Sequence, residues 1–341
     1  LPSYLSVHSG GIVISEKPMT WFSATFLPPK GFPTTQFSML EAEDVGLYKF
    51  DVLSQRGLAK IQEGLALAAK NHPENPPRDI NDLAFFKNDP RINALLTRAD
   101  ALGCFYVESP AMRMLMTKLS VNNYLGLVAA SSVIRPGVSQ SGMMRTYILR
   151  HRFPEERKKA HPLLLKIMPE TYGVMVYQED VIKVAHYFAG LTLGESDVLR
   201  RAMSGKFRSR SEFLVIKEKF FQNCGNKGYR FELIKSIWDQ IESFAGYAFA
   251  KGHSASYAVE SYQSLYLKAY YPLEYMTACI NNFGGFYRTE FYIYEARKLG
   301  ARVEAPCIQR GAYQSVLKGV VLILGFNLVN GVERNTIRNI V

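Results

Sequence analysis

The sequence predicts an α+β protein in which helices dominate. Apolar residues recur at helical spacing in several long segments, most clearly in residues 58–69, 112–119 and 181–189. Strands are predicted within residues 7–15, where a Gly pair precedes a short β-type run, and within residues 46–53, which alternate like a half-buried strand. Residues 103–110 predict a further short strand that turns into a helix at Pro110. A hydrophobic fraction of 48% without any low-complexity tract indicates a globular protein. The 341 residues are sufficient for two or three domains.

The charge of the chain is positive and unevenly distributed. The net charge is +11, which predicts either a polyanionic partner or simply a basic soluble protein. Residues 200–235 carry ten Lys or Arg side chains against three Glu, and residues 135–166 carry eight against two. Two basic blocks close in sequence are what a surface for a phosphate backbone needs, so nucleic acid is the candidate partner.

The cysteines and the apolar runs restrict the cellular setting. The four cysteines stand singly, without a C-x-x-C pair, which fits a reducing cytoplasm better than a zinc site or a disulfide framework. The longest apolar run, residues 319–326, is too short to span a bilayer, so no membrane partner is expected. The chain starts at Leu1 in a strand-forming region and stops at Val341 in a helical pattern, so we expect a piece of a longer protein.

The first candidate site lies on the strand predicted within residues 46–53. Lys49 and Asp51 are two residues apart, so on a strand they point to the same face. They can form a structural ion pair, or a metal ligand beside a phosphate-binding lysine. A two-metal phosphoryl site needs a second carboxylate, and none stands at comparable spacing in this region.

The second candidate site follows the helix predicted over residues 181–189. Thr192 and Glu195 have the spacing of a capping box, which predicts the start of another helix. That helix carries Arg200 and Arg201 side by side. Neighbouring arginines point about 100° apart, so they can hold an anion with several oxygens from two sides. They can equally lie in solvent without a ligand.

Two loops contribute further candidates. Arg135 stands at the entry to a loop rich in Pro and Gly, where it could contact a phosphate or cap a helix. A glycine-broken aromatic loop holds Tyr247, Lys251 and His253, and we expect Ser254 to cap the helix that follows. Aromatic and cationic residues near a helix N-terminus suit a base and a phosphate, although a packed loop with a solvated lysine is the simpler interpretation.

The last segment, residues 317–341, has an apolar run, a turn at residues 330–331 and a helical pattern. We expect Ile337, Ile340 and Val341 to point inward on that helix. The pattern is compatible with a helix-hairpin-helix, which presents backbone amides to a DNA phosphate. Similar hydrophobic–Gly–hydrophobic hairpins are common in other proteins.

Taken in order, these segments resemble family C of the DNA polymerases, the bacterial DNA polymerase III α subunits. The resemblance covers nearly the whole chain, and a set of ordered strings is far more specific than one motif. The strings are HSGGIVIS (8–15), GLYKFDVL (46–53), VESPAM (107–112), IRPGVSQSGM (134–143), HPLL (161–164) with ETYGVMVYQEDV (170–181), LGESDVLRRAM (193–203) and FAGYAFAKGHSASYA (244–258).

The resemblance implies a domain order and an activity. Residues 1–56 would be the C-terminal part of a polymerase-β-like nucleotidyltransferase palm, residues 57–305 a large helical fingers domain, and residues 306–341 the start of a helix-hairpin-helix region that contacts duplex. The implied function is template-directed DNA synthesis from dNTPs on primer–template DNA. A sliding clamp and other replicase subunits would be met through regions mostly outside this chain.

The resemblance also implies roles for the candidate residues. Asp51 would be the third palm carboxylate that binds the catalytic Mg²⁺ pair, and Lys49 the lysine beside it. Arg200 and Arg201 would bind the triphosphate of the incoming nucleotide. The complete set of expected nucleotide-binding residues is Arg135, Arg200, Arg201, Tyr247, Lys251 and His253, and the basic block adds Lys206, Arg208 and Arg210 as DNA-binding residues.

The chain departs from the family pattern in several places. The upstream acidic motif with the other two palm carboxylates is absent, so we expect the chain alone to be catalytically inactive. The usual RPGP reads RPGV, with Val138, and Ala250 and Gly252 replace the usual Asn and Ser of the fingers loop. These changes leave open a damage-tolerance paralogue of the α subunit. A basic DNA-binding module without chemistry of its own is a further alternative.

Overall fold

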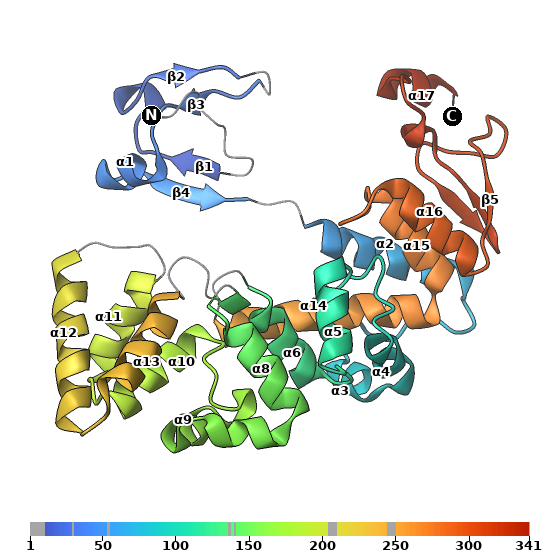
Figure 1. Ribbon diagram of the computed structural model, residues 1–341. Coiled ribbons are helices and arrows are strands. Elements are labelled where there is room, and N and C mark those ends of the chain that lie inside the picture. The colour runs from blue at the N-terminus through green and yellow to red at the C-terminus, as the bar shows by residue number, and fades with distance from the viewer. Residues whose placement is uncertain are drawn as a thin grey trace. The chain divides into compact units, whose positions relative to one another are not determined.

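The computed structural model describes residues 11–28, 31–52, 55–135, 138–139, 141–203, 210–243 and 250–340. The chain divides into two compact units, Leu1–Arg56 and Gly57–Val341. Helices dominate and the sheets are small, which confirms the predicted α+β class (Figure 1). The assignment of these units to a palm end, a fingers domain and a third region stays a prediction.

The first unit is built from two small antiparallel ladders. Strand β1 (Gly11–Ile14) pairs with β4 (Tyr48–Asp51), and β2 (Thr25–Phe26) pairs with β3 (Thr34–Thr35). A 3₁₀ turn, η1 (Met19–Trp21), and one helix, α1 (Met39–Asp44), complete the described part. Ser38 and Glu41 form a capping box at the start of α1.

The strands at residues 11–14 and 48–51 confirm the two predicted near the N-terminus. The expectation of a half-buried β4 is wrong, because Tyr48 is 70% exposed and Phe50 53% exposed. The physical reason is that, among the described residues of this unit, nothing covers the face of the two-stranded β1–β4 ladder that carries these side chains.

The second unit is a helical assembly with three short strands at its C-terminal end. The helices that start before residue 200 are α2 (Arg56–Asn71), α3 (Leu83–Asn88), α4 (Pro90–Thr97), α5 (Pro110–Lys118), α6 (Tyr124–Val133), α8 (Met143–Arg152), α9 (Pro162–Ile167), α10 (Gln178–Lys183) and α11 (Leu193–Met203). The later ones are α12 (Arg210–Asn226), α13 (Phe231–Ser243), α14 (Lys251–Tyr270), α15 (Pro272–Asn281), α16 (Thr289–Lys298) and α17 (Arg334–Ile340). Short 3₁₀ segments are η2 (Pro154–Lys159), η3 (Pro169–Thr171) and η5 (Phe326–Leu328).

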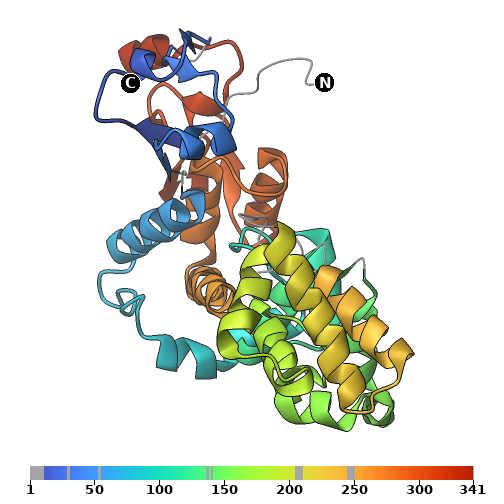
Figure 2. The same ribbon diagram turned by 90° about the vertical axis from the view of Figure 1, so that its left-hand side faces the viewer.

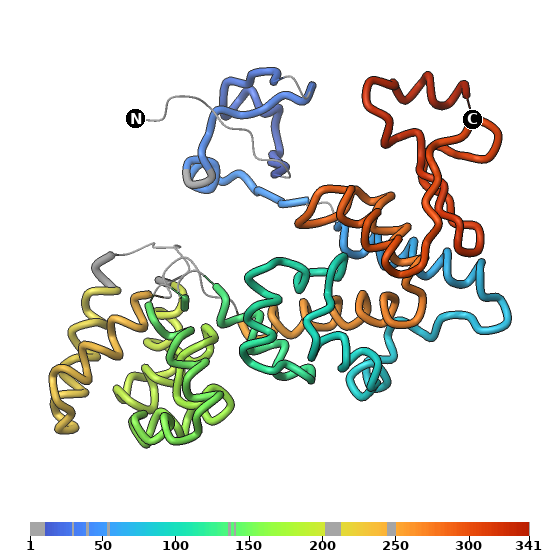
Figure 3. The backbone as a smooth tube through the Cα atoms, turned by 45° about the vertical axis from the view of Figure 1, so that its right-hand side comes forward, coloured from blue at the N-terminus to red at the C-terminus, as the bar shows by residue number. Residues whose placement is uncertain are grey.

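Helix α14 is the element around which the second unit packs. It contacts α3, α4, α6 and α15, and Figure 3 shows it passing along α6 towards α15. Its buried side chains include Ala258, Tyr262, Leu265 and Leu267. Burial of the apolar surface of Leu265 and its neighbours stabilises the fold by roughly 25 cal/mol for each Å² removed from water. The helix begins at Lys251, so the prediction that Ser254 is the N-cap is wrong: Ser254 is buried and its Oγ accepts a hydrogen bond from Ser132 Oγ at 2.6 Å.

The helices α10 to α13 stand together as a bundle, coloured from yellow-green to gold in Figure 2. The helix predicted over residues 181–189 is confirmed, with a π-helical segment, η4 (Val184–Phe188), continuing α10. The expected apolar face is buried, and Gly190 ends the segment with φ at +72°. The capping box before α11 is confirmed, since Thr192 N donates to Glu195 Oε2 at 2.8 Å and Glu195 N to Thr192 Oγ1 at 3.2 Å.

The C-terminal segment differs from the sequence expectation. The apolar run forms a hairpin of β6 (Val316–Lys318) and β7 (Val321–Ile323), and β7 also pairs in parallel with β5 (Arg302–Glu304). On α17, Ile337 is buried, whereas Ile340 is 41% exposed, so its inward orientation was predicted wrongly. Val341 lies outside the described residues. Gly319, with φ at +58°, makes the tight hairpin turn between β6 and β7.

Among the described helices, none combines the length and the apolar composition that crossing a membrane would require.

Candidate functional site

The first unit places Lys49 and Asp51 on one face of β4, as their spacing predicts. Lys49 Nζ lies 2.7 Å from Asp51 Oδ1 and 2.9 Å from Asp51 Oδ2, so the ammonium faces both carboxylate oxygens. The Asp51 side chain is 47% exposed and therefore accessible to a ligand. Gly11 lies directly opposite on β1 and adds no side chain to this face.

The described residues do not form a metal site by themselves. Nowhere in the described ranges do three His, Cys, Asp or Glu side chains lie close enough together to hold an ion. Asp51 offers one carboxylate on β4. A pair of divalent ions requires more than one such group.

In the second unit, Arg200 and Arg201 share a carboxylate on their own helix. Arg200 Nε lies 2.8 Å from Asp197 Oδ1, and Arg201 Nε lies 3.1 Å from Asp197 Oδ2. The two guanidinium groups thus approach two oxygens of one anion, which is the geometry expected from their adjacent positions. Arg201 is 61% exposed, so the pair can exchange this weak surface contact for a stronger anionic ligand.

The N-terminus of α14 gathers three of the predicted nucleotide-binding residues. Lys251 is the first residue of the helix and His253 lies in its first turn. Arg135, at the end of α6, lies over the ring of Tyr106, with its guanidinium carbon 5.2 Å from the ring centroid. Tyr257 packs against Tyr106 at 5.1 Å and against His253 at 4.2 Å. Residues more than 100 positions apart in the sequence therefore form one cluster.

The charge state of His253 follows from this cluster. Partial burial lowers the pKa of His253, and the nearby Arg135 guanidinium lowers it further. The lowered pKa favours the neutral form of His253, in which one ring nitrogen donates a hydrogen bond and the other accepts one. The cationic groups at this end of α14 are Arg135 and Lys251.

Two glutamates, Glu170 and Glu179, lie at the N-terminus of α14. The Lys251 backbone N–H donates to both carboxylate oxygens of Glu179, each at 3.0 Å. Lys251 Nζ forms an ion pair with Glu170, and it also lies 5.4 Å from the centroid of the Tyr177 ring. A helix N-terminus attracts anions through its free N–H groups and its dipole. The two carboxylates show that this position accepts negatively charged oxygens.

Sequence reasoning did not assign Glu170, Tyr177, Glu179 or Tyr106 to a site. The first three lie within the ETYGVMVYQEDV string, in which the sequence pattern indicates no role for the acidic residues. The available signal was charge: two glutamates in a chain with net charge +11, close to a predicted basic site.

Several predicted residues cannot be placed. Tyr247, Lys206 and Arg208 lie outside the described residues. Arg210 is the first residue of α12, and nothing is described of its side chain. The basic block is partly neutralised on the described helices, where Lys217 pairs with Glu242 and Lys219 with Glu195.

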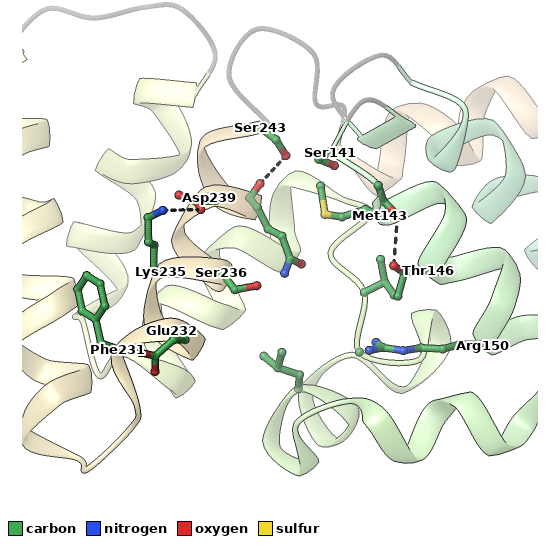
Figure 4. Close-up of a pocket in the computed structure, with 15 residues that line it drawn as sticks. Ser141, Met143, Thr146, Arg150, Phe231, Glu232, Lys235, Ser236, Asp239 and Ser243 are labelled. Atoms are coloured by element: carbon green, nitrogen blue, oxygen red, sulfur yellow. Dashed lines mark hydrogen bonds and ion pairs between the residues drawn. The ribbon is translucent and has the colours of Figure 1, made fainter.

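A cleft of about 840 Å³ lies between α8 and α13 (Figure 4). Its charged lining residues are balanced, since Arg150 and Lys235 stand against Glu232 and Asp239. Lys235 faces Asp239 at 3.9 Å, and Arg150 Nη1 donates to a backbone oxygen of Tyr172 at 2.9 Å. A cleft without excess positive charge is a poorer phosphate site than the N-terminus of α14. Size alone therefore does not identify the functional site.

Comparison with known proteins gives matches along the chain. Residues 58–228 match the family described as the bacterial DNA polymerase III alpha subunit finger domain, and residues 1–54 match the bacterial DNA polymerase III alpha NTPase domain. Among curated proteins, the DNA polymerase III subunit alpha of Aquifex aeolicus is 32% identical over 343 residues, which covers 100% of this chain and 29% of that protein. Proteins of the same name from Escherichia coli K12 (98% of this chain, 29% of that protein) and Staphylococcus aureus COL (100% and 31%) are each 33% identical. The chain therefore spans less than a third of the length of these relatives.

Proposed function

Because the chain belongs to the family of bacterial DNA polymerase III α subunits, we propose that it contributes to template-directed DNA synthesis by binding the incoming dNTP. The observation that carries this proposal is the N-terminus of α14, where Lys251 and His253 lie in the first turn and Arg135 is linked to His253 through the rings of Tyr106 and Tyr257. Arg200 and Arg201 on α11 would hold the triphosphate oxygens, in the way that they now approach Asp197.

The chain's own residues have distinct parts in this function. The arginines would neutralise charge on the phosphate oxygens, where each charge-assisted hydrogen bond contributes about 1.5–3 kcal/mol. Lys49 would hold the Asp51 carboxylate in its orientation on β4. Asp51 would be one of the family's Mg²⁺ ligands in the palm. Since Asp51 is a single carboxylate, the chain alone is predicted not to extend a primer.

The first test measures nucleotide binding by the 341-residue chain. We expect Arg200→Gln combined with Arg201→Gln to weaken dNTP binding roughly a hundredfold or more, because two charge-assisted contacts are lost. A control with Lys118→Gln and Lys158→Gln removes the same two charges from exposed positions elsewhere. Equal nucleotide affinity of both double variants would contradict the assignment of the arginines.

A basic DNA-binding module is the second candidate function, supported by the net charge of +11. Under this function the arginine variant lowers only DNA affinity and the steepness of its salt dependence. A primer-extension assay adds a separate readout: clear metal-dependent incorporation by the chain alone would contradict the predicted inactivity.

The remaining proposals follow from the family. Primer–template DNA would be the macromolecular substrate, and a sliding clamp and other replicase subunits would be partners of the longer protein. A cytoplasmic location fits these partners. The relatives named above are all called subunit alpha, so the comparisons do not favour the damage-tolerance paralogue.

A further inference from the structure

An exposed aromatic patch lies at α16 and the loop before it, outside every site described above. It consists of Phe286, Tyr287, Phe291 and Tyr294. Phe286 is 62% exposed, Phe291 52% and Tyr294 69%. Neighbouring aromatic side chains exposed to this extent mark an interaction surface, because isolated proteins rarely leave such groups in water without a partner.

The loop that carries Phe286 is fixed from beneath by buried groups. The Tyr292 hydroxyl donates to Glu108 Oε2 at 2.9 Å and accepts hydrogen bonds from the backbone N–H groups of Gly285 and Tyr287. Glu108 Oε1 accepts from Phe286 N at 2.7 Å. Tyr292 and Glu108 are both buried, so the backbone of the patch is held in one conformation without the aromatic rings themselves being covered.

Three rings of the patch, those of Phe286, Tyr287 and Phe291, form a continuous row. The Phe286 and Tyr287 centroids are 5.1 Å apart, with the rings nearly perpendicular, and Tyr287 and Phe291 are 5.3 Å apart. Tyr294 lies three residues after Phe291, on the same side of α16. Pre-positioned rings lose little conformational entropy when a planar ligand stacks on them.

Positive charge accompanies the row. Arg288 immediately precedes α16, and Arg297 and Lys298 lie in its last turn; all three are exposed. On the helix, Glu290 is the acidic residue that is exposed. Lys298 Nζ lies 3.8 Å from an oxygen of the buried Glu295, which is a long ion pair. An apolar protein partner would not need these cations, whereas a polyanion with flat, unpaired bases matches both the rings and the charges.

We propose that the aromatic patch binds single-stranded nucleic acid, with bases stacked on Phe286, Phe291 and Tyr294 and phosphates contacting Arg288 and Arg297. This surface goes beyond the proposed function, because it needs neither a dNTP nor a metal ion. It serves a strand without sequence preference, since every base has a face that can stack.

The test measures fluorescence anisotropy of a labelled oligothymidylate with the 341-residue chain and its variants. Stacking contributes about 1–3 kcal/mol per base, so Phe286→Ala and Phe291→Ala should each weaken binding roughly five- to a hundredfold. Tyr187→Ala is the matched control, because Tyr187 is an aromatic residue on η4 that is 58% exposed. It should leave affinity within about twofold, which is the variation expected at a site without contact.

Phe291→Leu separates stacking from general apolar contact, because leucine keeps the hydrophobic volume but has no ring. The proposal expects Phe291→Leu to lose nearly as much affinity as Phe291→Ala, and a duplex of the same sequence to be affected much less than the single strand. Circular dichroism confirms that these exposed substitutions leave the fold intact.

Three results would overturn the proposal. One is an absence of oligothymidylate binding by the unmodified chain, and another is binding that the alanine variants leave unchanged. The third is full retention of affinity in Phe291→Leu, which would assign the patch to an apolar protein surface.

Discussion

Glu260 on α14 gives the sharpest prediction about pH. Its Oε1 is enclosed and accepts no hydrogen bond from the described residues. A Cβ added to Gly57 would lie 2.1 Å from this oxygen and 2.6 Å from the Phe105 ring, so the carboxyl group is confined at the start of α2. Burial raises the pKa of Glu260 from its ordinary value of 4.5 to about 7, although Lys60 lowers it in part.

The sign and size of the effect follow from this pKa. A carboxyl group with a raised pKa in the fold stabilises the fold below its ordinary pKa, and this contribution is lost as the pH rises from about 4.5 to about 7. The full difference corresponds to about 3 kcal/mol. Since Glu260 is only partly buried, solvent reduces this to about 1–2 kcal/mol.

The assay compares thermal unfolding of the unmodified chain and of Glu260→Gln at pH 5 and pH 8. Glutamine resembles the protonated carboxyl group, so the two proteins should have similar Tm at pH 5. At pH 8 the variant should melt roughly 2–3 °C higher. Equal Tm values at pH 8, or a lower Tm for the variant, would refute the reasoning.

A second glutamate supplies a control of opposite sign. Burial alone would raise the pKa of Glu242, but hydrogen bonds from Lys217 and Trp238 outweigh it and lower the pKa. Glu242→Gln should therefore destabilise the fold at pH 8 and have less effect as the pH falls. A common response of both variants would indicate a general effect of pH on the chain.

Two further predictions concern α14. The buried Lys268 Nζ lies 3.0 Å from Glu295 Oε1, so Lys268→Met should lower the free energy of unfolding, measured in urea titrations, by about 3–5 kcal/mol. Adding Glu295→Leu should restore part of this loss, because it removes the unpaired buried charge. Additive losses in the double variant would contradict the ion pair. Glu170→Gln releases Lys251 Nζ from its exposed ion pair and should tighten dNTP binding up to about fivefold. The control Glu156→Gln, which releases Lys159 from a similar ion pair, should leave dNTP binding unchanged. Weaker binding by Glu170→Gln would contradict the assignment of Lys251.

Local patterns were sufficient to predict much of the helical fold. Periodicity predicted the helix at 181–189, and the capping box predicted the start of α11, because both depend on residues three or four positions apart. The residues Met112, Leu115, Met116 and Leu119 are all buried, as their spacing requires. These are features in which neighbours along the chain decide the outcome.

Contacts between distant segments could not be predicted in this way. The apolar run after residue 316 has no helical or strand period of its own, and pairing with β5 decides that it forms strands. Ser254 has the chemistry of an N-cap, but its hydroxyl meets Ser132, which is 122 residues away in sequence, and α14 starts one turn earlier. In both cases tertiary packing overrides a local preference.

The same distinction applies to the candidate site. The sequence supplied the cations Arg135 and Lys251, but not the carboxylates that face Lys251 or the tyrosines that separate Arg135 from His253. Glu179 closes the N-terminus of α14 from 72 residues away, and it is placed there by the folding of α10. An anion that replaces these carboxylates would meet an N-terminus whose helix is already fixed by its buried contacts with α6 and α15. Its binding energy would therefore not be spent on ordering α14, which would be the advantage of a phosphate site at the end of the central helix.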